Sequence, residues 1–142
     1  MIVNDVMSKH VISVRMDETL DVVRDILSAR RIHHAVVVDE GKVVGVISDR
    51  DVLRILSPFT GTNSERTIDA ATLHKRVHQF MTRNVQTIQS NLPVVDAAKV
   101  LLDRGISCLP VVSESGALLG IVTTRDVLRA ALRIGCFDRC AA

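Results

Sequence analysis

Apolar and polar residues along this chain form a series of blocks that occurs twice. In the first half, Leu20, Val23 and Leu27 recur at helical spacing. Two apolar runs, "AVVVD" and "KVVGVIS", then flank Glu40-Gly41 in the pattern of a β-hairpin. A short extended piece precedes the helix, and "RDVLRIL" after the hairpin has helical character. The pattern predicts the order β-α-β-β-α.

The second half repeats this order. "LPVVS" and "ALLGIVT" flank Glu114-Ser115-Gly116, and "RDVLRAAL" follows. Residues 30–54 match 104–129, with an offset of 74 (30 to 104) that becomes 75 (54 to 129) after the extra residue Ser115. Met7-Ser8 matches Met81-Thr82 in the same way. An internal repeat on this scale predicts two half-domains of one design.

The repeats define the expected organisation of the chain. The joint between them is polar and turn-rich at first, with Pro58 and Gly61, and we expect it to become helical from Asp69. The expected parts are a first repeat at residues 1–56, a linker at 57–76, a second repeat at 77–132 and a C-terminal tail at 133–142.

Continuous apolar strands such as Ala35–Val38 predict a sheet that is covered on both faces. Neither half is then expected to be stable alone. We therefore expect an α/β fold in which two repeats, related by a pseudo-twofold axis, pack through their sheets. Polar strand ends and the joint would line clefts between the halves, where a ligand could bind.

Composition and charge narrow the classes of function. The 142 residues are 47% hydrophobic but include three Phe, no Trp and no Tyr, so aliphatic side chains must fill the core. Lys plus Arg number 18 and Asp plus Glu 16, a balance that argues against a nucleic-acid-coating protein. No apolar run reaches the roughly 18 residues that span a membrane, and the first residues lack a secretory signal pattern. With three cysteines, an odd count, no disulfide framework is indicated. We expect a reduced, cytoplasmic protein.

The segments 48–51 and 123–126 carry the candidate chemistry, and two interpretations of them remain open. Ser48 with Asp51, and Thr123 with Asp126, have the spacing of a helix capping box. The same helix start also offers free backbone N–H groups and a positive dipole end to a phosphate. An adjacent hydroxyl and an Arg can bind phosphate oxygens, and the carboxylate can accept ribose hydroxyls.

These motifs in tandem resemble a pair of cystathionine-β-synthase (CBS) domains, also called a Bateman module. The pattern is Met-Ser/Thr, an apolar run, then Gly-apolar-apolar-Ser/Thr-x-Arg-Asp, and it extends from about Val3 to Leu132. The resemblance implies a pseudo-symmetric α/β pair that usually forms a homodimer. It also implies a regulatory sensor, not a catalyst, that binds an adenosine ligand such as AMP, ADP or ATP, or in some members S-adenosylmethionine or NAD, in the clefts between the repeats.

The resemblance also assigns residues to two mirrored clefts. In the first, Asp51 would hold the ribose, and the other assigned residues are Ser48, Arg50, Val46, Gln86, Ile106 and Ser107. In the second, Asp126 would hold the ribose, and the others are Thr123, Arg125, Ile121, Ile12, Ile32 and His33. Asp49 adds a negative charge beside the first site where the second has Thr124, so the first site should bind triphosphates less well and the site of Asp126 is favoured.

Other candidates for chemistry have plain structural interpretations. His33 and His34 are adjacent on a predicted strand and point to opposite faces, so they cannot easily share a metal ion. Cys136 and Cys140 supply only two of the four ligands that a zinc site needs. We expect incidental thiols there, with redox sensing or a metal shared across a dimer as alternatives. Cys108 is expected in the core.

The leading hypothesis is a stand-alone regulatory module whose adenosine ligand changes the arrangement read by a protein partner. No P-loop, dinucleotide glycine fingerprint or metalloprotease helix is present, and we expect neither enzyme activity nor a catalytic cofactor. The main alternative is a structural dimerisation module whose clefts are vestigial. A nucleic-acid-binding or redox-linked regulator is a third option.

Overall fold

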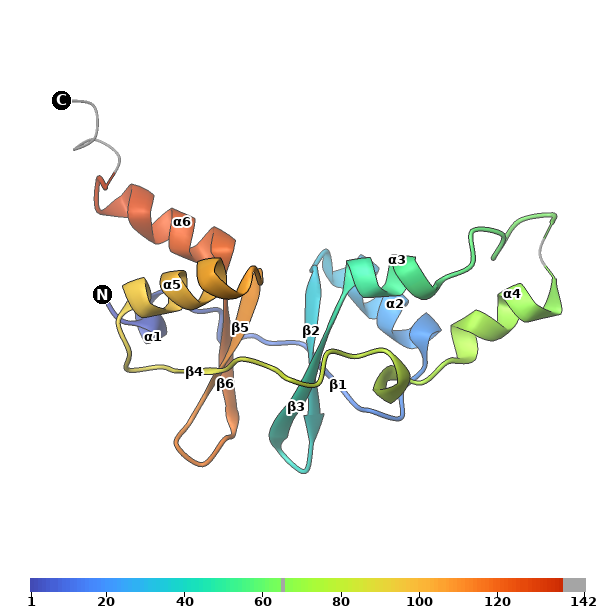
Figure 1. Ribbon diagram of the computed structural model, residues 1–142, viewed down its shortest axis with the longest axis horizontal. Coiled ribbons are helices and arrows are strands. Elements are labelled where there is room, and N and C mark those ends of the chain that lie inside the picture. Colours follow the sequence, from blue (N-terminus) through green and yellow to red (C-terminus); the bar gives the residue numbers. More distant parts are fainter. Residues whose placement is uncertain (65, 137–142) are drawn as a thin grey trace. The chain divides into compact units, whose positions relative to one another are not determined.

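The computed structural model describes residues 1–64 and 66–136, and each half contains the predicted order of elements (Figure 1). The elements of the first half are β1 (Ser13–Val14), α2 (Leu20–Arg30), β2 (His34–Asp39), β3 (Lys42–Ser48) and α3 (Asp49–Ile55). Those of the second are β4 (Ile88–Gln89), α5 (Val94–Arg104), β5 (Cys108–Val112), β6 (Leu118–Thr123) and α6 (Thr124–Arg133). The predicted α/β class with two β-α-β-β-α repeats is confirmed.

Short elements precede and join the repeats. They are α1 (Val3–Val6), α4 (Thr67–Ala71) and two 3₁₀ turns, η1 (Thr72–His74) and η2 (Val77–Gln79). Helix α4 begins two residues before Asp69, where the sequence predicted helix to start. The Asp69 carboxylate accepts a 2.9 Å hydrogen bond from the Arg66 amide, so Asp69 acts from inside the first turn and not as its first residue.

The compact units of the structure differ from the sequence repeats. One unit consists of residues 12–85, and the other combines residues 1–11 with 86–142. The N-terminal segment therefore packs with the second repeat, and residues 77–85 pack with the first. Each unit contains its own three-stranded sheet, in the order β1-β2-β3 or β4-β5-β6.

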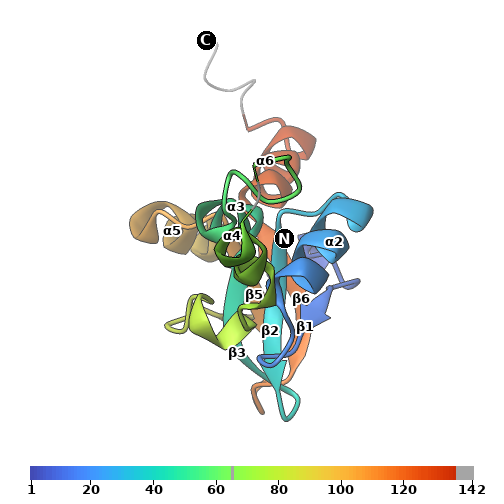
Figure 2. The ribbon, with the colours of Figure 1, turned by 90° about the vertical axis from the view of Figure 1, so that its right-hand side faces the viewer.

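The unit of residues 12–85 has the central strand of its sheet fully covered. β2 pairs in parallel with β1 and antiparallel with β3, and Ala35, Val36 and Val37 are 0% exposed. The β2–β3 turn places Glu40 (φ 46°) and Gly41 (φ 77°) in the left-handed region that a two-residue hairpin turn requires. Helices α2 and α3 lie side by side, towards the end of the hairpin opposite this turn (Figures 1 and 2).

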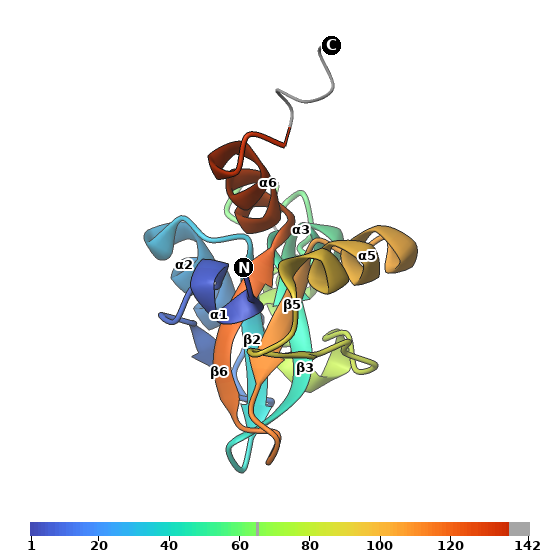
Figure 3. The ribbon, with the colours of Figure 1, turned by 90° about the vertical axis from the view of Figure 1, so that its left-hand side faces the viewer.

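The second unit repeats this arrangement with α5 and α6 beside the β5–β6 hairpin (Figures 1 and 3). Leu109, Val111 and Val122 of the sheet are 0% exposed, and Val3 of α1 joins the same apolar core. Because the polypeptide leaves each hairpin at its helix-covered end, the start of the final helix in each unit is fixed there.

Two glycines allow residues 1–11 and 77–85, which we call the exchanged segments because each packs with the other repeat, to lie across the hairpins. Ser8 exchanges two 2.9 Å backbone hydrogen bonds with Ile121 of β6. A Cβ atom at the neighbouring Gly120 would lie 2.8 Å from the Ser8 carbonyl oxygen and 2.7 Å from Met7 Sδ. The Met-Ser/Thr motif and the glycine of the last strand are thus in direct contact with each other.

The same contact occurs in the other unit. Thr82 and Val46 exchange backbone hydrogen bonds of 2.9 and 3.1 Å. A Cβ atom at Gly45 would lie 2.7 Å from Met81 Sδ and 3.0 Å from the Thr82 carbonyl oxygen. The methionine sulfur is the nearest atom in both units, but the carbonyl oxygen is 3.0 Å away at Gly45 and 2.8 Å at Gly120, so Gly45 has slightly more room.

We predict that Gly120→Ala lowers the free energy of unfolding by about 1–3 kcal/mol, because the new methyl group forces the Ser8 backbone away from β6. Urea denaturation monitored by circular dichroism measures the change. Leu119→Ala, at a 40% exposed position on the same strand, is the control and should cost clearly less. An unfolding free energy for Gly120→Ala equal to that of the wild type contradicts the close approach.

Candidate functional site

The two Ser/Thr-x-x-Asp segments form the N-termini of α3 and α6. In the second unit, Thr123 Oγ1 accepts a 3.3 Å hydrogen bond from the Asp126 amide, and Asp126 Oδ2 accepts one of 2.9 Å from the Thr123 amide. Thr123 Oγ1 also donates to Asp126 Oδ2 at 2.6 Å. The capping box predicted from the sequence is therefore present.

Ser48 and Asp51 make the same set of bonds at the start of α3. The Asp51 amide donates to Ser48 Oγ at 3.2 Å, and Asp51 Oδ2 accepts from the amide and the hydroxyl of Ser48, both at 2.8 Å. The first unit thus has its own capping box, which the sequence also predicted.

The two oxygens of each capping carboxylate have different surroundings. Oδ2 is occupied by the cap, whereas Oδ1 of Asp126 accepts a hydrogen bond at 3.3 Å from the exposed Arg129 guanidinium and from no other group among residues 1–64 and 66–136. Oδ1 of Asp51 faces Arg54 in the same way at 3.4 Å. Both carboxylates are mostly buried, with 16% and 17% of the side chain exposed. Each can therefore complete the cap and still offer Oδ1 to a ligand hydroxyl.

The first helical residue distinguishes the two sites. Asp49 Oδ2 lies 2.7 Å from His33 Nδ1, and the Asp49 amide donates to the His33 carbonyl oxygen at 3.0 Å. The hydrogen bond from His33 holds the pKa of Asp49 below its usual value, with a smaller contribution from the Arg50 amide, although partial burial acts in the opposite direction. The site of α3 thus carries an acidic group tied to a histidine.

In the second unit the corresponding positions hold no charge. The Thr124 amide donates to the Ser107 carbonyl oxygen at 3.1 Å, and the Thr124 hydroxyl approaches the same oxygen at 3.4 Å. The backbone bond is therefore the same in both units, and only the side chains differ. Sequence reasoning noted the exchange of Asp49 for Thr124 but did not predict that His33 and Asp49 pair.

The assigned site residues divide equally between the two units. The unit of residues 12–85 contains Ile12, Ile32, His33, Val46, Ser48, Arg50 and Asp51. The other unit contains Gln86, Ile106, Ser107, Ile121, Thr123, Arg125 and Asp126. Val46 and Ile121 are half-buried on the last strand of each hairpin, where the exchanged segments pair with them. Ile32 and Ile106 pack against the core of their own unit and line the groove between its two helices.

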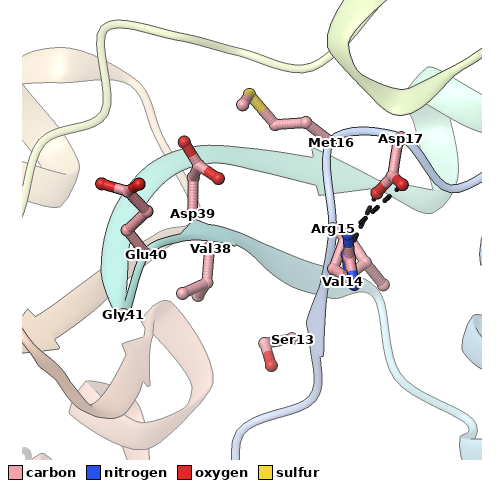
Figure 4. Close-up of a pocket in the computed structure, with 9 residues that line it drawn as sticks. All are labelled: Ser13, Val14, Arg15, Met16, Asp17, Val38, Asp39, Glu40 and Gly41. Atoms are coloured by element: carbon pink, nitrogen blue, oxygen red, sulfur yellow. Dashed lines mark hydrogen bonds and ion pairs between the residues drawn. The ribbon is translucent and has the colours of Figure 1, made fainter.

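A hollow of about 520 Å³ lies elsewhere in the first unit, between the end of β1 and the β2–β3 turn (Figure 4). Arg15 is paired with Asp17 at 3.1 Å, and Asp39 and Glu40 lie together at the tip of the hairpin. Sequence reasoning did not single out this hollow. Within the described part of the chain, no three His, Cys, Asp or Glu side chains are grouped to hold a metal ion.

The remaining candidates can be placed individually. Cys108 is in the core, as predicted, and burial raises the pKa of its thiol to about 11. Burial also lowers the pKa of His34. Cys136 is exposed, and Cys140, the other thiol of the predicted pair, lies outside the described residues. None of the helices among residues 1–64 and 66–136 has the length and apolar character to cross a membrane.

Comparison with known proteins places these features in a family. The model of the CBS domain matches residues 3–58 and 77–133. A CBS domain-containing protein of Dictyostelium discoideum is 38% identical over 135 residues, which cover 94% of this chain and 92% of that protein.

Two solved structures are similar over nearly their whole length. The structure of CBSX2 in complex with AMP has a TM-score of 0.78 and 31% identity, and the match covers 94% of this chain and 97% of that one. The CBS domain pair of protein MJ0100, in complex with 5′-methylthioadenosine and S-adenosyl-L-methionine, has a TM-score of 0.76 and 30% identity and covers 92% and 94%.

We predict that Asp49→Asn lowers the unfolding free energy at pH 7 by at most about 1 kcal/mol, because the His33–Asp49 pair is partly exposed to solvent. Since the pKa of Asp49 is lowered in the folded state, its contribution is present above the ordinary carboxyl pKa of about 4 and is lost as the pH falls through the lowered value. Urea denaturation between pH 7 and pH 3 should therefore show the two proteins converging on the acid side. Asp103→Asn, at an exposed helical position, is the control. A difference that persists unchanged at low pH contradicts this role.

Proposed function

This chain belongs to the CBS domain family, and on that premise we propose that it is a regulatory module that binds an adenosine nucleotide at its capping segments. Binding would change the conformation or the assembly of the module, and a protein partner would respond to that change. A ligand has this effect only to the extent that it binds one arrangement more tightly than the other. The proposal includes a homodimer in the cytoplasm, with no catalytic step and no catalytic cofactor.

The observation that carries the proposal is that the two oxygens of each capping carboxylate have different hydrogen-bond partners. Oδ2 of Asp126 is held by Thr123, while Oδ1, within the described part of the chain, bonds only the exposed Arg129. An acceptor in this position suits a ribose hydroxyl. The family resemblance gives Asp126 and Asp51 this role, and similar proteins have been solved with AMP and with S-adenosyl-L-methionine.

Phosphate would bind next to the ribose at the helix start. α6 contains ten residues, and Thr123 and Arg125 lie in or before its first turn. Backbone N–H groups and an Arg side chain together favour an anion. We propose the corresponding role for Ser48 and Arg50, and a packing role against the base for Ile121 and Val46.

The remaining assigned residues belong to the proposal as additional contacts to the same ligands. They are Gln86, Ile106 and Ser107 for the site of Asp51, and Ile12, Ile32 and His33 for the site of Asp126.

The two sites should differ in their preference for phosphate. Asp49, paired with His33, adds a carboxylate to the first turn of α3, whereas Thr124 leaves the first turn of α6 without one. A negative charge near a phosphate opposes its binding. We therefore propose that a phosphorylated ligand binds preferentially at the Thr123–Asp126 segment.

The alternative is a structural dimerisation module. One observation favours it: each capping hydroxyl and each Oδ2 already makes its hydrogen bonds within the protein. In that case Asp126→Ala costs about 1 kcal/mol of stability through the lost cap and changes no response to a ligand. The two functions therefore differ in a single measurable property.

Isothermal titration calorimetry with AMP, ADP, ATP, NAD and S-adenosylmethionine tests the proposal. We expect at least one ligand to bind with a Kd below about 1 mM, or roughly −4 kcal/mol. Asp126→Ala should weaken that binding at least about tenfold, since the carboxylate–ribose bonds are lost. Asp5→Ala removes the N3 carboxylate of α1, which bonds the Ile2 amide, and is the matched control that should leave binding unchanged. The absence of binding heat with every adenosine ligand would leave the dimerisation module as the better account.

A further inference from the structure

Each capping carboxylate has an arginine one helical turn further along the chain. In α6, the Arg129 guanidinium donates to Asp126 Oδ1 at 3.3 Å, and in α3 the Arg54 guanidinium donates to Asp51 Oδ1 at 3.4 Å. Side chains of an α-helix lean towards its N-terminus, so an arginine three positions later can reach back to the carboxylate. Both units therefore place a guanidinium on the carboxylate oxygen that the cap does not use.

The stability of the helix does not account for this arginine. The Arg129 side chain is 61% exposed, and an ion pair with so exposed a partner adds little to folding because water screens it. The cap is complete without the arginine, since Thr123 bonds Asp126 through Oδ2. The Asp126 side chain is only 16% exposed. The main effect of Arg129 is therefore to place a positive charge beside a mostly buried carboxylate.

A carboxylate that binds the ribose also opposes the binding of phosphate. The ribose and the phosphates of a nucleotide are joined, so a ligand held by Asp126 brings its phosphates close to that carboxylate. Like charges repel, and the repulsion is stronger beside a mostly buried group than in open water. A nucleoside, which has no phosphate, meets no such repulsion. A cation that neutralises the carboxylate therefore raises the affinity for nucleotides and leaves the affinity for nucleosides nearly unchanged.

The net charge of the two capping segments shows how much depends on this cation. Residues 123–129 contain two arginines and one aspartate, which gives a formal charge of +1. Residues 48–54 contain two arginines and two aspartates, which gives zero, because Asp49 is added. Removal of Arg129 would lower the first value to zero. The positive charge that distinguishes the segment of α6 therefore depends on Arg129 as much as on the absence of an acid at Thr124.

We propose that Arg129 is a specificity-determining residue of the Asp126 site. It neutralises the ribose-binding carboxylate, so that the site selects nucleotides over nucleosides, and more strongly as the ligand carries more phosphates. This inference rests on the proposed function, because it requires a ribose at Asp126 and a phosphate at the start of α6. It differs from the role of Arg125, which is to contact the phosphate directly.

NMR titrations of the ¹⁵N-labelled full chain test this role, because the amide signals of Thr124 and Arg125 report on the start of α6 and not on that of α3. The ligands are adenosine, AMP and ATP without divalent cations. The variant is Arg129→Gln, which removes the charge but keeps a good helix former. We expect the Kd for adenosine to stay within about twofold of the wild-type value. The Kd should rise about threefold for AMP and at least about tenfold for ATP, since each phosphate adds negative charge.

Two further variants separate charge from structure. Arg133→Gln removes the same charge from an exposed position one turn further along α6, and it should change each Kd by less than about twofold. Arg129→Lys keeps the charge and should retain most of the preference for ATP over adenosine. The difference between wild type and Arg129→Gln should also shrink as salt is raised from about 50 to about 500 mM, because salt screens exposed charges.

Circular dichroism establishes that each variant is folded, and Arg129→Met replaces Arg129→Gln if the latter is not. An equal loss of affinity for adenosine and ATP would show a purely structural role and overturn the inference, as would an equal effect of Arg133→Gln. A wild-type protein that binds ATP, with the same preference over adenosine in Arg129→Gln, overturns the inference but leaves the proposed function intact. A wild-type protein that binds none of the three ligands overturns both.

Discussion

The close passage of the Met-Ser/Thr segments over glycine is the constraint on which both units depend. Ser8 bonds to Ile121 and Thr82 bonds to Val46 through backbone atoms, and these bonds are possible because Gly120 and Gly45 have no side chain. Each segment that begins one sequence repeat is therefore built into the unit of the other repeat. The arrangement holds the last strand of each hairpin in place, and that strand leads directly into the helix that carries the capping carboxylate.

Structural and functional roles coincide in this carboxylate. One oxygen of Asp126 fixes the start of α6, and the other accepts a 3.3 Å hydrogen bond from the exposed Arg129. A cap that is already complete does not have to reorganise when a ligand arrives, which favours binding. The same bonds would exist in a protein that binds nothing, so the cap by itself does not reveal the function, and the family membership gives it meaning.

Local patterns gave the elements and the caps of this protein correctly. Helical spacing of apolar residues, the Glu40-Gly41 turn and the Ser/Thr-x-x-Asp spacing all act over a few residues, and the structure contains each of them. The covered central strand was also predictable, because β2 is continuously apolar. The assignment of residues from both repeats to shared ligand sites stays a prediction.

Long-range pairings were not predictable from the sequence by the same means. The repeat shows that Met7-Ser8 and Met81-Thr82 are equivalent. Any residue can form backbone hydrogen bonds, however, so the sequence does not show which strand each segment pairs with. The His33–Asp49 pair connects residues 16 positions apart, and each has several plausible partners.

The central claim is that the start of α6 binds the sugar and phosphate of an adenosine nucleotide. A titration of ¹⁵N-labelled protein with AMP, followed by the amide signals of Thr124, Arg125 and Asp126, tests it most directly. The account predicts that these signals shift progressively and saturate with a Kd below about 1 mM, and that in Asp126→Ala the Kd measured from the Thr124 and Arg125 signals rises at least about tenfold. Amide signals of α6 that remain in place at saturating AMP would contradict it.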